Sequence, residues 1–184
     1  MGEAKDEWSR FKVVYRESYH AVTRYLARRL APELVDDAAS EVFTIAWERW
    51  STRRGAALPW LYGIARRVAA NVRRSRARRD RLADRLRHEK NLVRGEEAGA
   101  ELQVLERMGA ARILARLPER DREVLMLVSW DGLEPAEAAQ ALGCSRATFT
   151  VRLHRARRRL ERELVGDVTA VTEPRPMTAE GTAT

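Results

Sequence analysis

The stretch LGCSRATFTVRLHRARRRL, residues 142–160, constrains the fold more than any other part of this sequence. Gly143 can adopt the positive φ that ends a helix at little cost, and Ser145 is a good N-cap for a following helix. After the cap, apolar residues recur at intervals of four, three and four, which places them on one helical face: Phe149, Leu153, Ala156 and Leu160. Upstream, Pro135 suits the first turn of a helix that ends at the glycine. The stretch therefore predicts two helices joined by a tight turn, which is the layout of a helix-turn-helix.

In the rest of the chain, apolar residues also recur at helical spacing. Nowhere do apolar and polar residues alternate over a sustained run, as they would in a half-buried strand. Helices are expected over about 7–30, from Pro32 to about 50, and from about 59 to 79, with a loop at 51–59. The predicted class is all-α, with two small helical domains joined by a linker. The expected boundaries are 7–80 for the N-terminal domain, 81–107 for a linker that is partly helical at its ends, 108–165 for the C-terminal domain and 166–184 for a disordered tail.

Composition narrows the function classes. The chain of 184 residues has 35 lysines and arginines against 27 acids, a net charge of +8 that favours an anionic partner such as nucleic acid. A single cysteine, Cys144, excludes an internal disulfide, and the three histidines lie far apart, so no metal site and no cofactor are expected. The N-terminus has no apolar signal core, and no run approaches the roughly 20 apolar residues of a membrane span. We expect a cytoplasmic protein that does not bind membranes.

Charge is segregated along the chain. Residues 33–48 hold five acids and no base, residues 66–81 hold eight arginines against one acid, and residues 146–162 hold seven arginines against one acid. One acidic helix suits a basic protein partner, whereas two basic helices in different halves suit two nucleic-acid sites.

The second helix of the predicted motif has a front that can approach DNA closely, because its side chains there are small. Arginines follow behind that front, where they can reach base edges and flanking phosphates. The residues expected to contact DNA are Ala147, Thr148, Thr150, Val151, Arg152, His154 and Arg155. Arg158 and Arg159 lie more than a turn later and are expected to meet phosphates or solvent. The alternative is an ordinary solvated basic helix, which the glycine turn, the cap and the apolar stripe together disfavour.

Two longer motifs, DDAASEVFTIAW and LPERDREVLMLVSWDGLEPAEAAQALGCSRATFTVRLHRARRRL, resemble the bacterial sigma factors of the extracytoplasmic-function (ECF) branch. The resemblance covers about 8–80 and 108–163. It implies a transcription initiation factor without catalytic activity that gives core RNA polymerase its choice of promoter. The implied partners are the polymerase core, through the clamp of its largest subunit, and promoter DNA; an anti-sigma protein is a further candidate.

The resemblance also implies site residues. The helix around 36–50 would dock on the polymerase through Asp36, Asp37, Glu41, Phe43 and Trp47. The loop and helix around 51–79 would recognise and open the promoter's −10 element through Tyr62, Arg66, Arg67, Asn71, Arg73 and Arg74. The C-terminal helix-turn-helix would read the −35 element. Tyr62 could stack on an unpaired base, although an aromatic residue at the start of a helix is more often part of a core.

The chain departs from the family pattern at a few positions. The family more often has Asn and Asp at Arg67 and Asn71, a basic residue at Thr150, and Ser or Thr at Glu134. Two other functions fit the sequence less well. A stand-alone helix-turn-helix regulator would need a dimer face, and no heptad pattern provides one. A nucleic-acid enzyme would need clustered carboxylates or a nucleophile near the basic surface, and neither basic helix carries such a cluster.

Overall fold

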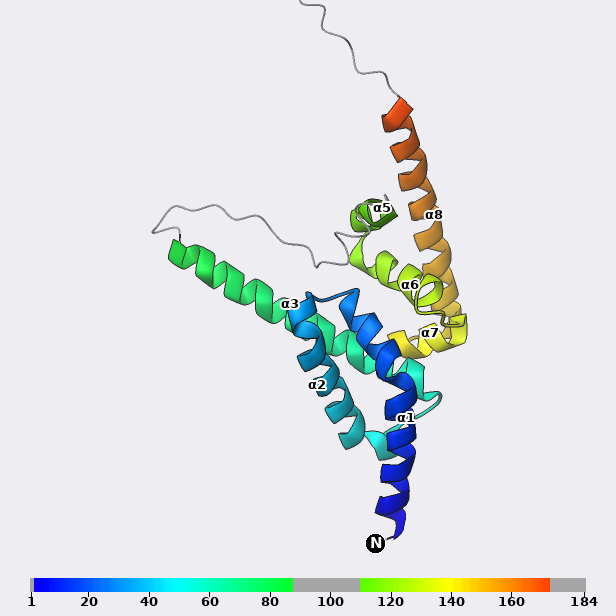
Figure 1. Cartoon of the computed structure of the whole chain (residues 1–184). Helices are drawn as coiled ribbons and strands as arrows, with labels where there is room; N and C mark the ends of the chain where they lie inside the picture. The colour runs from blue at the N-terminus through cyan, green and yellow to red at the C-terminus, as the bar shows by residue number, and fades with distance from the viewer. Residues whose placement is uncertain (1, 88–109, 173–184) are drawn as a thin grey trace, which may run out of the picture.

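The computed structural model describes residues 2–87 and 110–172, and its described residues form helices and loops without a strand. The N-terminal half contains α1 (Gly2–Ala27), the short 3-10 helix η1 (Pro32–Leu34), α2 (Val35–Glu48), a second 3-10 helix η2 (Trp50–Thr52) and α3 (Ala57–Arg87). The C-terminal half contains α5 (Ala110–Arg116), α6 (Glu119–Ser129), α7 (Pro135–Leu142) and α8 (Arg146–Thr172). Figure 1 shows the two groups of helices, with α1 and α3 as the long helices of the first and α8 as that of the second. The predicted all-α class is confirmed.

The N-terminal group packs α1, α2 and α3 against one another. Val22, Val42 and Leu61 lose all contact with solvent at the centre of this group. Burying side chains of this size contributes about 1.5–3 kcal/mol each, so the shared core holds the three helices together. The predicted apolar stripe of the first helix is buried only in part, because Trp8 and Tyr15 remain exposed at its edge.

The connection from α2 to α3 is shorter than the predicted loop. Trp50 begins the 3-10 turn η2, and α3 starts at Ala57, two residues before Pro59. A proline is tolerated there because the first turn of a helix has no intrahelical partner for its N–H groups. Gly55 takes a φ of 74°, which turns the chain into α3.

The C-terminal group is built around α8, which α5, α6 and α7 all contact. Leu127, Phe149, Leu153 and Ala156 form the buried centre, as the spacing of the apolar residues predicts. Pro118 separates α5 from α6 and stands at the N-cap of α6. This packing fixes which side of α8 faces inward and leaves the opposite side of its first turns in solvent.

The structure bears on two of the expected boundaries. The helix α3 continues to Arg87, into the stretch predicted as a linker, and residues 88–109 lie outside the described residues. The tail predicted to be disordered from 166 is helical as far as Thr172, because extending a formed helix adds a hydrogen bond per residue without a new nucleation step. The expected tail beyond 172 lies outside the described residues.

The two groups of helices touch, since α7 packs against α3 (Figure 1).

Candidate functional site

The turn between α7 and α8 has the geometry that its residues predict. Gly143 is left-handed with a φ of 64°, and its N–H donates to the Gln140 carbonyl at 3.1 Å. The Ser145 hydroxyl accepts a hydrogen bond from the Thr148 N–H at 3.1 Å, which caps the first turn of α8. The α7 helix starts with a second cap, in which the Glu137 carboxylate accepts the Glu134 N–H at 2.9 Å. The capped α8 helix therefore begins at a defined place and angle.

The outward face at the start of α8 is open to solvent. All seven residues predicted to contact DNA are exposed: Ala147, Thr148, Thr150, Val151, Arg152, His154 and Arg155. Val151 leaves 49% of its surface in solvent although it is apolar, which suits contact with a thymine methyl group. The Thr150 hydroxyl donates to the Arg146 carbonyl at 2.9 Å. The structure thus brings small, apolar and basic groups together on one face of a helix end.

Arg159 is exposed, as expected, but it also has a partner within the chain. Its guanidinium forms an ion pair with Asp121 of α6, within the C-terminal group. The pairing follows from the α6–α8 packing, which sequence spacing does not show. Arg158 and Arg159 are both exposed, and Arg159 also forms a surface ion pair between α8 and α6.

The middle of α3 carries the exposed part of the predicted −10 set. Arg67, Asn71 and Arg74 are exposed, and together with α2 they line an open groove of about 310 Å³. Glu41 and Arg49 complete its polar lining. The groove places the predicted −10 residues directly beside Glu41, which belongs to the predicted polymerase face. Three guanidinium groups against one carboxylate make this groove suited to an anionic ligand.

Tyr62, predicted to contact −10 DNA, is only 3% exposed and is therefore not on a DNA-facing surface in this structure. Its ring stacks on Tyr25 at 4.8 Å between centroids, because the start of α3 lies against α1. Burial raises the pKa of Tyr62 to about 12. Arg66 is half-buried beside it on α3, whereas Arg73 is exposed and pairs with Glu119 of α6.

The acidic face of α2 is exposed at Asp36, Asp37 and Glu41, as predicted. Phe43, predicted to bind the polymerase, is instead 6% exposed and packs against Tyr15 and Tyr19 of α1. The reason is its place on the side of α2 that meets α1, where an aromatic ring is most stable when buried.

Trp47 keeps 39% of its surface exposed at the far end of α2. Its ring meets that of Trp8 edge-on, with centroids 4.9 Å apart, and lies 5.2 Å from that of Phe11. The exposed aromatic side chains therefore gather at this end of α2, and Trp8 is one of them although nothing in its local sequence distinguishes it from a core residue.

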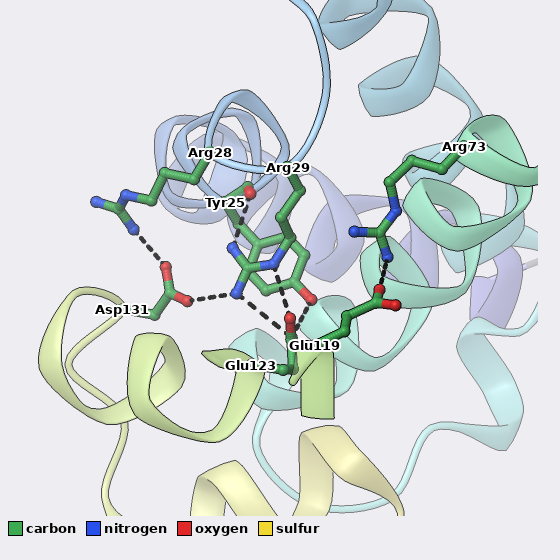
Figure 2. A network of polar contacts seen from close by, with 7 residues as sticks. All are labelled: Tyr25, Arg28, Arg29, Arg73, Glu119, Glu123 and Asp131. Atoms are coloured by element: carbon green, nitrogen blue, oxygen red, sulfur yellow. Dashed lines mark hydrogen bonds and ion pairs between the residues drawn. The ribbon is translucent and has the colours of Figure 1, made fainter. Parts of the chain in front are cut away.

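A network of buried polar residues, which sequence reasoning missed, joins the two groups of helices (Figure 2). The Arg29 side chain, 4% exposed, donates from Nε to Glu123 Oε2 at 3.0 Å and from Nη2 to Asp131 Oδ2 at 3.3 Å. The Tyr25 hydroxyl donates to Glu123 Oε1 at 2.7 Å, and Arg28 Nη1 lies 2.5 Å from Asp131 Oδ1. We call Tyr25, Arg28, Arg29, Glu123 and Asp131 the interdomain network.

The electrostatics of this network reflect its burial. Desolvation raises the pKa of the Tyr25 hydroxyl well above its ordinary value, with Glu123 adding to the effect. Burial also raises the pKa of Asp131, although Arg29 and Arg28 act in the opposite direction. For Arg29, burial alone would lower the pKa, but the nearby Tyr25, Glu123 and Asp131 outweigh it and raise the pKa. The Tyr25 phenol therefore stays protonated and Arg29 stays charged at neutral pH, so both remain hydrogen-bond donors in this network.

Further contacts join α7 to the loop in front of α3. Gln140 Nε2 donates to the carbonyls of Arg54 and Ala56, each at 3.1 Å. At Gly63 the backbones of α3 and α7 approach so closely that an added Cβ would lie 3.2 Å from the Ala141 carbonyl oxygen. Local sequence patterns cannot predict these contacts, because the partners are separated by about 80 residues.

The described helices include none that is both long and apolar enough to span a membrane. Within the same residues, histidine, cysteine and acidic side chains form no group of three that could hold a metal ion.

Comparisons with known proteins place both halves in one family. The family description Sigma-70 region 2 matches residues 14–79, and Sigma-70, region 4 matches residues 107–160. Among curated proteins, the chain is 33% identical over 167 residues to the RNA polymerase sigma-E factor of Streptomyces coelicolor, covering 90% of this chain and 89% of the relative. The chain belongs to the ECF branch of the sigma factors.

Two further relatives are matched over less of their length. The ECF RNA polymerase sigma factor SigD of Mycobacterium tuberculosis is 35% identical over 138 residues, which cover 71% of this chain and 63% of SigD. The probable RNA polymerase sigma factor RfaY of Xanthomonas campestris is 34% identical over 138 residues, which cover 71% of this chain and 34% of RfaY.

A solved structure shares the fold. The sigma factor RpoE of Bartonella quintana, crystallised with the anti-sigma factor NepR, superposes with a TM-score of 0.61 at 21% identity. The match covers 84% of this chain and 96% of that one.

Proposed function

We propose that this sigma factor binds core RNA polymerase through the acidic face of α2 and reads a promoter with α3 and α8. The observation that carries the proposal is the start of α8, a capped helix whose outward face is exposed and combines small, apolar and basic side chains. A helix end of this composition fits the major groove, with arginines placed to reach base edges and phosphates. This end of α8 would read the −35 element.

The −10 element would meet the middle of α3, where Arg67, Asn71 and Arg74 line the groove beside α2. Arginine binds phosphate in a fork, so a backbone held here would be oriented as well as attracted. The adjoining acidic face, with Asp36, Asp37 and Glu41, would dock on the clamp of the largest polymerase subunit. The exposed edge of Trp47 would supply apolar contact at the end of that face.

In this function the chain acts by binding, and the polymerase supplies the chemistry of transcription in the cytoplasm. An anti-sigma protein is a further candidate partner, because the structurally similar RpoE was crystallised with one.

The test is run-off transcription with purified core polymerase. We expect promoter-specific transcripts from the parent chain and a loss of core binding in the double variant Asp37→Arg with Glu41→Arg. Reversing two exposed charges on α2 should leave the helical content unchanged, because surface substitutions usually change stability by no more than about 0.5 kcal/mol. The control is Glu7→Arg with Glu17→Arg, which makes the same charge change at exposed positions of α1. Equal core affinity in both double variants would refute the assignment of α2.

A further inference from the structure

We propose that Val151 is a specificity-determining residue of α8, which selects a thymine in the −35 element by contact with the thymine methyl group. The inference rests on the proposed function, because it names the base chemistry that the outward face of α8 would read. Its consequence is a preference for a T·A pair over a C·G pair at one position of the element, since thymine carries a methyl group where cytosine carries a hydrogen atom.

The first support is the place of Val151 on the helix. An α-helix turns by about 100° per residue, so Val151 lies about 200° from the buried Phe149, on the side opposite the apolar stripe. Its side chain is 49% exposed at the centre of the outward face. Ala147 lies one turn before it and Arg155 one turn after it, and both are exposed. The short side chain of Ala147 lets this part of the helix approach base edges closely.

The second support is that neither packing nor helix formation accounts for a valine here. Val151 is not part of the buried core, and valine is a poorer helix former than alanine or arginine because its branched side chain loses rotamer freedom. It does not belong to a wider apolar patch either. Leu164 and Val165, the other large apolar residues that the described part of α8 exposes, lie about three and a half turns further along the helix. A single apolar side chain among basic ones suits a nucleic acid better than an apolar protein surface.

The third support is the chemistry of the groups around Val151. Most groups at base edges in the major groove form hydrogen bonds, and the thymine C5-methyl group is the apolar exception. Arg152 and Arg155 can donate to guanine or to phosphate, but neither distinguishes thymine by its methyl group. The Thr150 hydroxyl donates its proton to the Arg146 carbonyl at 2.9 Å, so it does not donate to a base at the same time. In a helix, valine occurs mainly in one χ1 rotamer, which fixes its methyl groups and makes the contact selective.

The test uses the holoenzyme, formed from the full-length chain and core polymerase. Duplexes are first selected from a library randomised over both promoter elements, and the enriched duplex is resynthesised with uracil in place of each −35 thymine in turn. Uracil pairs as thymine does and lacks only the methyl group. We expect one such change to weaken binding by the parent about fourfold, as the loss of one buried methyl group should, and to leave binding by Val151→Ala unchanged.

The matched control is Val13→Ala, which truncates a valine of α1 that is 53% exposed and should respond to uracil as the parent does. The Val151→Ala variant keeps its helix, because alanine is the better helix former.

A second arm places the methyl group on a different base pair. The thymine found in the first arm is replaced by cytosine or by 5-methylcytosine, each opposite guanine. We expect the parent to bind the 5-methylcytosine duplex about fourfold more tightly than the cytosine duplex, and Val151→Ala to bind the two equally.

An equal cost of uracil for the parent and for Val151→Ala would overturn the proposal, because another side chain would then meet the methyl group. The same conclusion would follow if no thymine of the enriched element responds to uracil, or if the parent binds the cytosine and 5-methylcytosine duplexes equally. A parent holoenzyme that enriches no −35 sequence at all would refute the proposed function of α8 together with this inference, and that result is distinct from the others.

Discussion

The two long basic helices, α3 and α8, look alike in sequence but differ in how much of their charge is available. The first three turns of α8 present Arg152, His154 and Arg155 to solvent without a competing domain above them. The first turns of α3 lie under α7, and two of its arginines, Arg73 and Arg76, form ion pairs with Glu119 and Glu33. The difference shows that a run of arginines marks an electrostatic surface, whereas the packing of neighbouring helices decides which part of it a nucleic acid can reach.

The largest expected effect is a loss of stability when the buried side chain that holds α8 in place is truncated. Phe149 has no exposed surface, and Phe149→Ala should lower the free energy of unfolding by about 3–5 kcal/mol because it leaves a cavity under the DNA-facing turn. Chemical denaturation followed by circular dichroism measures the change. Val151→Ala, on the exposed side of the same turn, is the control and should be near neutral. Similar losses for both variants would show that the inward face of α8 has been misplaced.

The next effect concerns base reading by α8. Arg155→Ala should weaken binding to the cognate −35 element by about 1–3 kcal/mol and relax preference at particular bases, since a side chain at a base edge carries sequence information. Arg159→Ala should leave the preference unchanged, because Arg159 is paired with Asp121. Competition over a randomised −35 library with each variant holoenzyme measures both. A preserved sequence preference in Arg155→Ala, with an altered one in Arg159→Ala, would contradict the orientation of α8.

A smaller effect is expected to distinguish the groove-lining Arg74 of α3 from the ion-paired Arg73. Arg74→Ala should reduce promoter opening and lower the salt dependence of DNA binding by about one phosphate contact, because Arg74 lines the open groove. Arg73→Ala removes an exposed ion pair with Glu119, worth up to about 1 kcal/mol. Permanganate footprinting at several salt concentrations measures the open complex. Identical salt slopes for Arg74→Ala and the parent would show that this residue does not meet phosphate.

The smallest expected effect is a change in stability at alkaline pH, which depends on the burial of Tyr62 near the start of α3. The pKa of Tyr62 is raised from 10.0 to about 12, so the folded chain holds this proton more tightly than the unfolded chain. The resulting stability is fully present below pH 10 and is lost as the pH rises through about 12. Tyr62→Phe removes that dependence, so the variant should lose less stability than the parent between pH 8 and pH 11. Urea unfolding at both pH values tests this, and equal losses in the two chains would place Tyr62 in a solvated environment.

The sequence by itself determined the local features of this protein. The spacing of Phe149, Leu153 and Ala156, the glycine turn and the Ser145 cap predict the helix-turn-helix and its exposed face, because caps and periodicity act over a few residues. The motifs around these residues were sufficient to identify the family, and the comparisons with known proteins confirm it.

The tertiary structure alone decided which of these residues are covered. Tyr62 and Phe43 are buried because α1 packs over both, whereas the sequence left each a possible place on a binding surface. Arg29 and Asp131 are 102 positions apart, and each has the local sequence of an ordinary solvated charge. Their burial in one network follows from the packing of the two domains, and a contact between residues so distant in the chain leaves no periodicity or spacing from which it could be predicted.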